Sequence, residues 1–356
     1  MNDRVELVPT LQPGAQVRPI GRRIRDVLSS THQDAAPGLL LQRLVDESLA
    51  ELPRPGFGCT LERWQALCEV AMHDLSLAKL YEGHTDARAI LAELGDDQVP
   101  AGSAWGVWAA ESRDARVRIV ATERTTVRLR GRKSWCSGAK VLTHVLLTTW
   151  QQDGTGPILV RVALAQPGVR VTEEGWNAVG MAASGSVDVE FDDAEGSIVG
   201  APRDYLSRPG FWHGGAGIAA CWYGGCASLA RTLQSAVAAS AGSVTDPFRA
   251  VALGRVDVAL RHTAAVLREA AAWIDRYPLD DAGAMALRVR LSAEQCADTV
   301  LSEVGKALGA PAFCRNARFA RIAADLPVFV RQSHAARDCL ALAERVVDQG
   351  VEAWQL

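Results

Sequence analysis

The spacing of apolar residues is helical near the start of the chain. Apolar side chains recur at intervals of three and four across residues 39–53, which predicts an amphipathic helix. A linker rich in proline and glycine follows at 52–58. A second helix is predicted from Thr60, which we expect to be its N-cap, and a third covers about 85–94. These elements predict an N-terminal helical domain over residues 37–98.

The period changes at Val99. From there to Gly200 apolar and polar residues alternate and β-branched residues cluster, which is typical of strands. Gly, Asp and Pro punctuate these runs at the intervals expected of an antiparallel barrel or sandwich. We therefore predict a β domain over residues 99–201. The runs richest in β-branched residues are 117–120, 125–129, 141–149, 158–164, 169–171 and 187–191.

After Pro202 the helical period returns and persists. Long segments each carry one apolar stripe, and the last contains Pro327, which must kink that helix or begin it. Such helices predict a bundle over residues 202–356. The fold class is therefore α+β: a helical domain, a central antiparallel β-barrel or sandwich, and a C-terminal helical bundle. No internal repeat is visible.

The first 36 residues are rich in proline, arginine and polar residues. We expect residues 1–36 to be poorly ordered apart from a short segment at 24–28. This stretch lacks the apolar centre of a signal peptide, and the chain has no uninterrupted apolar run of about 18 residues. We therefore expect a cytoplasmic protein that does not enter a membrane.

Composition narrows the function classes. The 356-residue chain is 48% hydrophobic and 22% charged, with a formal net charge of −3. Scattered arginines and a slightly acidic balance argue against a nucleic-acid partner. The eight cysteines form no CxxC pair and no spacing with histidine that suits zinc, so we expect free thiols and no metal site.

One stretch carries candidate chemistry: the nine residues from Gly131 to Ala139. Glycines at both ends allow sharp turns, and between them lie Trp135, Cys136 and Ser137. Taken alone, these residues favour an ordinary strand–turn–strand with a half-buried tryptophan. Their neighbours in the chain change that interpretation.

The order of domains and four short motifs resemble the acyl-CoA dehydrogenase superfamily, over roughly residues 40–350. In that family a segment like 105–109 opens the β domain, and a strand motif like 131–139 touches the flavin. A stretch like 180–193 leaves the β domain. The fourth and weaker motif is Ala324-Asp325, with alanine where the family usually has arginine.

The resemblance implies a flavoprotein oxidoreductase with FAD, a CoA- or carrier-bound acyl substrate, and a homodimer or homotetramer. Reduced flavin requires hydrogen-bond donors near its ring edge and a dry aromatic wall. The residues that the resemblance implies for flavin binding are Trp105, Val107, Trp108, Trp135, Cys136, Ser137 and Arg249.

The catalytic base departs from the family. The family's glutamate occupies one of two positions, which correspond here to Ser333 and Gly214. Neither is a carboxylate, but His334 and His213 stand beside them, and a histidine can act as a general base at neutral pH. Both histidines are equally explained as packing or solvated residues. His84 and Glu82, on a helix that borders the substrate cavity in this family, are further candidates.

Three functions remain open at this point. We favour an FAD-dependent acyl-CoA dehydrogenase-like oxidoreductase acting on a CH–CH bond. The alternatives are a flavin-dependent monooxygenase on the same fold, which needs no base for an α-proton, and a member without redox activity. The segment 110–114 also departs from the family's Gly-Ser-Asp-like turn for the acyl-CoA arm, so acyl-CoA is not secured as substrate.

Overall fold

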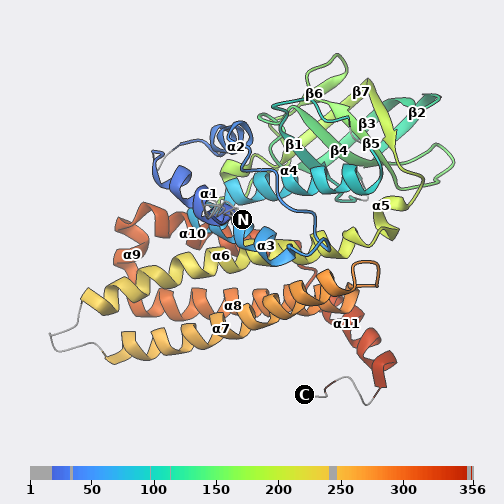
Figure 1. The fold of residues 1–356 in the computed structure, drawn as a ribbon. Coiled ribbons are helices and arrows are strands. Elements are labelled where there is room, and N and C mark those ends of the chain that lie inside the picture. Colours follow the sequence, from blue (N-terminus) through green and yellow to red (C-terminus); the bar gives the residue numbers. More distant parts are fainter. Residues whose placement is uncertain are drawn as a thin grey trace, which may run out of the picture.

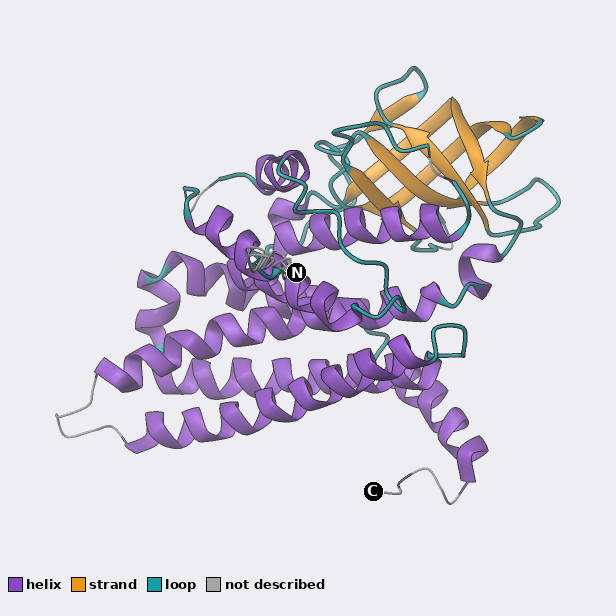
Figure 2. Cartoon of the chain, viewed as in Figure 1, coloured by secondary structure: helices purple, strands orange, loops and turns teal. Residues whose placement is uncertain are grey.

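The computed structural model describes residues 18–32, 35–96, 98–112, 114–239, 247–350 and 354. All of its strands gather in one part of the molecule, and helices form the remainder (Figures 1 and 2). The α+β class is confirmed. Of the segment predicted to be poorly ordered, residues 1–17 and 33–34 lie outside the described residues. The described part includes a helix longer than the predicted 24–28 segment.

In the described part of the chain, four helices precede the strands: α1 (Ile20–Ser29), α2 (Pro37–Asp46), α3 (Thr60–His73) and α4 (Leu75–Glu93). The helix predicted over residues 39–53 corresponds to α2, which ends at Asp46 and not at Pro53. Thr60 is the first residue of α3 and not its cap. Its hydroxyl donates to Asp275 Oδ1 (2.6 Å) and accepts from the Gly56 N–H (2.8 Å), which ties α3 to the bundle.

Helix α4 begins ten residues earlier than predicted. The side chain of Asp74 caps it by accepting a hydrogen bond from the Leu77 N–H (2.7 Å). The helix lies between the β domain and α6, and buried residues occur on all its sides. A helix covered all round shows no amphipathic stripe, so apolar spacing could not reveal its first half.

The β domain contains β1 (Trp105–Trp108), β2 (Val117–Glu123), β3 (Thr126–Cys136), β4 (His144–Thr149), β5 (Ile158–Ala163), β6 (Val169–Val171) and β7 (Val187–Val199). The strand order is β1-β4-β5-β7-β3-β2, with β6 beside β7. A bridge between Arg118 and Trp150 returns β2 to the end of β4, so the sheet closes on itself. Of the predicted antiparallel barrel or sandwich, the structure has the barrel, and its pairing is antiparallel except between β1 and β4 and at the bridge between Arg118 and Trp150.

The C-terminal half is helical: α5 (Asp204–Ser207), α6 (Gly210–Ala239), α7 (Pro247–Arg276), α8 (Gly283–Leu308), α9 (Ala310–Arg315), α10 (Ala317–Phe329) and α11 (Ala336–Gln349). Helices α6, α7 and α8 pack side by side as a bundle (Figure 1). The predicted last helix is in fact two, α10 and α11, separated at residues 330–335. Pro327 lies in the last turn of α10.

Among the described residues, no helix is both long enough and apolar enough to cross a membrane.

Candidate active site

Three of the sequence motifs meet at one junction. The Trp108 indole Nε1 on β1 donates to the Ser137 carbonyl in the turn after β3 (3.1 Å). The Ser137 hydroxyl lies 2.8 Å from that of Ser186, and the Gly138 N–H donates to the Ser184 carbonyl (2.8 Å). Strand β1, the turn after β3 and the turn before β7 therefore form one continuous wall.

The fourth motif, Ala324-Asp325 on α10, contacts the segment that leads into this wall. Gly180 lies so close to α10 that an added Cβ would be 2.1 Å from the Ala324 carbonyl oxygen. The Met181 N–H donates to Asp325 Oδ1 (2.5 Å). Burial raises the pKa of Asp325 to about 6. Asp325 thus positions the turn that carries Ser184 and Ser186.

The tryptophan near the end of β3 faces outward. Trp135 has a left-handed backbone (φ 59°) and its side chain is 51% exposed. The next residue, Cys136, points inward, is fully buried and donates its Sγ–H to the Lys133 carbonyl (3.2 Å). Trp135 therefore presents a ring face to a ligand, whereas the Cys136 side chain belongs to the core.

Trp105 and Val107 of β1 differ in which of their groups a ligand could contact. Trp105 is fully buried and stacked on His144 (4.8 Å between centroids), and its main-chain N–H donates to His84 Nδ1 (3.1 Å). Alternate N–H groups of a strand point the same way, so that of Val107 also points away from β4 and toward α4. Gly83 of α4 faces it: an added Cβ there would be 3.8 Å from the Val107 nitrogen.

The base positions, far apart in sequence, converge on one arginine. Arg290 of α8 donates to the Gly215 carbonyl on α6 (3.1 Å) and to the Gln332 carbonyl (2.6 Å), and pairs with Asp338 (3.6 Å). Gly214 and Ser333 each adjoin one of these carbonyls. The two alternative positions of the family's glutamate therefore lie around a single guanidinium group, and neither carries a carboxylate.

The predicted histidines lie in different surroundings. His334 is exposed, with Nδ1 3.3 Å from Asp338, and Ser333 is buried with its hydroxyl 3.4 Å from the same carboxylate. His213 is buried, and its Nε2 has no hydrogen-bond partner in the described part of the chain. Burial lowers the pKa of His213, so it is neutral at pH 7. Its ring lies against Gly56 in the linker before α3.

Arg249 is separated from the other predicted residues. It lies in the first turn of α7, at the end of the bundle far from the β domain (Figure 1). There its Nε donates to the Ala307 carbonyl (3.2 Å). The structure does not bring it to the junction within one chain, and its expected contact with flavin across a subunit interface stays a prediction.

Sequence reasoning missed a carboxylate at the junction. Asp86 of α4 lies so close to α6 that an added Cβ on Gly214 would be 2.6 Å from Asp86 Oδ1. Asp86 makes no hydrogen bond or ion pair with any residue that the structure describes, and burial raises its pKa. Glu82, which the sequence did suggest, is paired with Lys79 (3.0 Å). The i, i+4 spacing of Glu82 and Asp86 was the available signal.

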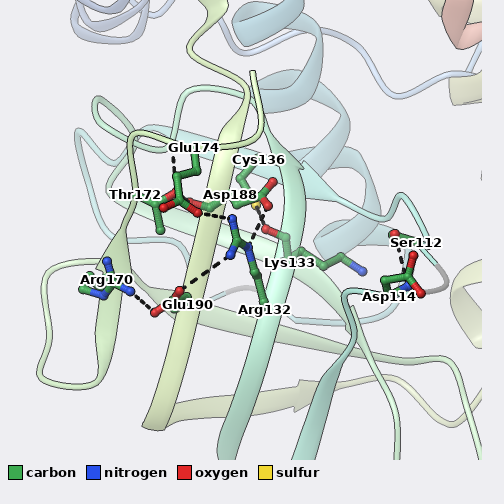
Figure 3. A network of polar contacts seen from close by, with 10 residues as sticks. All are labelled: Ser112, Asp114, Arg132, Lys133, Cys136, Arg170, Thr172, Glu174, Asp188 and Glu190. Atoms are coloured by element: carbon green, nitrogen blue, oxygen red, sulfur yellow. Dashed lines mark hydrogen bonds and ion pairs between the residues drawn. The ribbon is translucent and has the colours of Figure 1, made fainter. Parts of the chain in front are cut away.

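A polar network fixes the strand that leads to Trp135. Lys133 is buried inside the barrel, where its Nζ donates to Glu111 (3.0 Å) and to the Thr148 hydroxyl (2.8 Å). Its neighbour Arg132 points to the other face and pairs with Asp188 (2.7 Å), as Figure 3 shows. Glu111 is thus bound to residues of the barrel. It occupies the place of the turn that, in the acyl-CoA dehydrogenase family, helps to bind the acyl-CoA arm.

An open cavity of about 610 Å³ lies elsewhere, on the outer face of the barrel beside Trp105 and His144. Its arginine, Arg161, already bonds to Asp96 (3.0 Å) and to the Gln98 side chain (2.6 Å). None of the residues predicted to be catalytic borders it. The junction of β1 with the two turns, together with the adjoining helices α4 and α6, is therefore the better candidate for chemistry.

The chain was compared with known protein families and with curated proteins. No family model matches the chain. The amino sugar nitrososynthase DnmZ of Streptomyces peucetius is 36% identical over 85 residues. That alignment covers 22% of this chain and 21% of DnmZ, so the chain matches about a fifth of this curated relative's length.

Solved structures match nearly the whole chain. KijD3, in complex with FMN and a dTDP-linked amino keto sugar, superimposes with a TM-score of 0.77 at 18% identity over 96% of both chains. TdsC of Paenibacillus sp. A11-2, with FMN and indole, gives 0.79 at 15% identity, covering 93% of this chain and 96% of TdsC. A nitrososynthase from Micromonospora carbonacea var. africana gives 0.72 at 18%, covering 89% and 93%. The chain has the acyl-CoA dehydrogenase-like fold that these flavin enzymes share.

Proposed function

We propose that this protein is a flavin-dependent oxygenase that uses reduced FMN and molecular oxygen to oxidise a small molecule. One observation carries the proposal: both positions at which a dehydrogenase of this fold has its glutamate lack one and surround Arg290. A guanidinium group cannot accept a proton. An oxygenase of this fold needs no base for the α-proton of a thioester.

The junction suits a flavin. The half-exposed face of Trp135 would form the wall against the ring system, and the Ser137 hydroxyl and the Val107 N–H would donate to its polar edge. FMN is proposed in place of FAD because the solved structures of KijD3 and TdsC contain FMN. When bound and reduced, the flavin supplies two electrons to oxygen.

The substrate is proposed to be a nucleotide-linked amino sugar. KijD3 was solved with a dTDP-linked amino sugar, and DnmZ is an amino sugar nitrososynthase. Both support this choice over an acyl thioester. Glu111 supports it too, because it is held by Lys133 and by the Trp150 indole N–H (2.9 Å) and so does not form the acyl-CoA turn.

The test is oxygen uptake. The purified protein is given FMN, NADH and a flavin reductase, with and without the dTDP-amino sugar found in KijD3, and the sugar product is identified by mass spectrometry. We expect substrate-dependent oxygen consumption and a product heavier by one oxygen. Bleaching of a bound flavin by an acyl-CoA without oxygen would instead establish the dehydrogenase function.

The flavin wall has its own test. Trp135→Ala removes the exposed ring and should weaken FMN binding by about 2 kcal/mol, or roughly 30-fold. FMN titration by fluorescence measures this, and circular dichroism should show an unchanged fold. Trp354→Ala, which removes another exposed tryptophan, is the matched control. Equal FMN affinity in the two variants would place the flavin elsewhere.

A further inference from the structure

Asp86 lies on α4, the helix that contacts both β1 and α6. Gly83, one turn before it, faces Val107 on β1, and Asp86 itself faces Gly214 on α6. Residues three apart on a helix are neighbours on its surface. The carboxylate is therefore positioned beside the strand that we propose to bind the flavin, at the base position on α6.

The other charged groups around Asp86 are engaged with the protein. Glu82 pairs with Lys79, and Arg208 pairs with Glu93 (2.7 Å). Arg63 donates to the Thr85 hydroxyl (3.2 Å). Asp86, half-buried and without a partner among the described residues, is the carboxylate of this group left for a ligand.

Gly214 and Asp86 depend on each other. Any side chain at 214 would collide with the Asp86 carboxylate, since even a Cβ would be 2.6 Å from its Oδ1. A glutamate at 214 would also bring two carboxylates together, which raises the pKa of one. The glycine thus allows a carboxylate to enter the site from α4 and not from α6.

We propose that Asp86 binds the amino group of the substrate and takes a proton from it, so that the nitrogen is oxidised as the neutral amine. This inference rests on the proposed function. The proton moves from R–NH3⁺ to the carboxylate, which frees the nitrogen lone pair. The overall reaction is R–NH2 + O2 + reduced flavin (two electrons, two protons) → R–NHOH + oxidised flavin + H2O.

The electrostatics of the position agree with this role. Burial raises the pKa of Asp86, which makes it a stronger proton acceptor than an exposed aspartate. The titratable and charged groups that face it are Lys79, Glu82, Arg63, Tyr205 and Arg208. The three cations favour the ionised carboxylate and so act against the effect of burial on its pKa, whereas Glu82 raises that pKa further.

The test compares two ligands on one variant. Asp86→Asn keeps the shape and removes the charge, so it should bind the dTDP-amino sugar about 10- to 100-fold more weakly while binding dTDP as the wild type does. Calorimetry on the flavin-free protein measures both affinities. With FMN and reductase, kcat/KM for the amine should fall by about 100-fold or more, and FMN affinity should stay unchanged.

Two further variants complete the test. Gly214→Ala leaves Asp86 in the sequence but displaces its carboxylate, and should reproduce the loss of amine affinity. Asp257→Asn, the same change on the exposed face of α7, should alter nothing. If the wild type binds and oxidises the amino sugar and Asp86→Asn does so equally well, the assignment of Asp86 is wrong and the oxygenase function stands. A wild type that neither binds nor oxidises it overturns both.

Discussion

Two tryptophans of the candidate site have opposite surroundings. Trp105 is enclosed, stacked on His144 and bonded through its indole N–H to Ser103 (2.7 Å), whereas the side chain of Trp135 is half-exposed. The family resemblance implied contact with the flavin for both. Only Trp135 has a free ring face, so at the scale of the residue, burial decides which aromatic group a ligand can reach.

The side chain of His84 links helix α4 to strand β1. Its Nδ1 accepts the Trp105 N–H, so the ring must be neutral there, and burial lowers the pKa of His84 from 6.5 to about 4. Because this folded-state pKa lies below the unfolded value, the unfolded chain binds the proton more readily between pH 6.5 and 4. Stability is therefore full above pH 6.5 and falls as the pH drops toward 4.

We expect His84 to account for about 3 kcal/mol of lost unfolding free energy across that range. Urea unfolding at pH 7 and pH 4.5 measures it. In His84→Gln the drop between the two pH values should be smaller than in the wild type, although stability at pH 7 also falls. His262→Gln, a change at an exposed histidine of α7, is the control. An unchanged drop in His84→Gln would contradict the assignment.

Among the elements, α4 organises the site. One of its sides contacts β1 through Gly83 and His84, and another contacts α6 through Asp86. Helix α10 contributes through Asp325, which binds the turn at Met181. Two helices that are about 240 residues apart in the chain thus support the junction.

The contact of α10 can be tested at Asp325. Asp325→Ala leaves the buried Met181 N–H without an acceptor and should lower the unfolding free energy by about 1–3 kcal/mol. Asp325→Asn keeps an oxygen acceptor and should cost less. Urea unfolding at pH 7 compares the two. If both variants lose the same stability, the hydrogen bond to Met181 is not what holds the turn.

Over the whole molecule, Arg290 joins segments that the chain keeps apart. It bonds to carbonyls at Gly215 and Gln332, pairs with Asp338, and lies 5.2 Å from the Trp222 ring centroid. One side chain therefore connects α6, α8 and the segment that begins α11. A planar group with several donors is required for this, and lysine cannot replace it.

Arg290→Lys should loosen α11 and leave the bundle folded. We expect amide hydrogens of residues 336–349 to exchange about 10- to 100-fold faster, because two charge-assisted hydrogen bonds are lost. Amides of α7 should keep their wild-type rates. Hydrogen exchange with mass spectrometry measures both regions. Arg255→Lys, at the exposed pair with Glu303 (3.1 Å), is the control, and equal exchange in the two variants would contradict the role of Arg290.

The sequence alone determined the fold class and the order of its parts. Helices α7 and α8 and the strands β2 and β3 each have one buried face, and a single buried face produces a periodic pattern of apolar residues in the sequence. The motifs around Trp135, Trp108 and Met181 could be placed in that order as well. The first half of α4 could not, because burial on all sides erases the period.

Only the tertiary structure decided which side chains meet. The approach of Asp86 to Gly214, the convergence of Gly215 and Gln332 on Arg290, and the parallel pairing of β1 with β4 join residues about 40 to 130 positions apart. Local spacing carries no information on such contacts, because they depend on how whole elements pack. The chemistry that we propose rests on them, and for that reason the carboxylate of Asp86 became visible only in the folded chain.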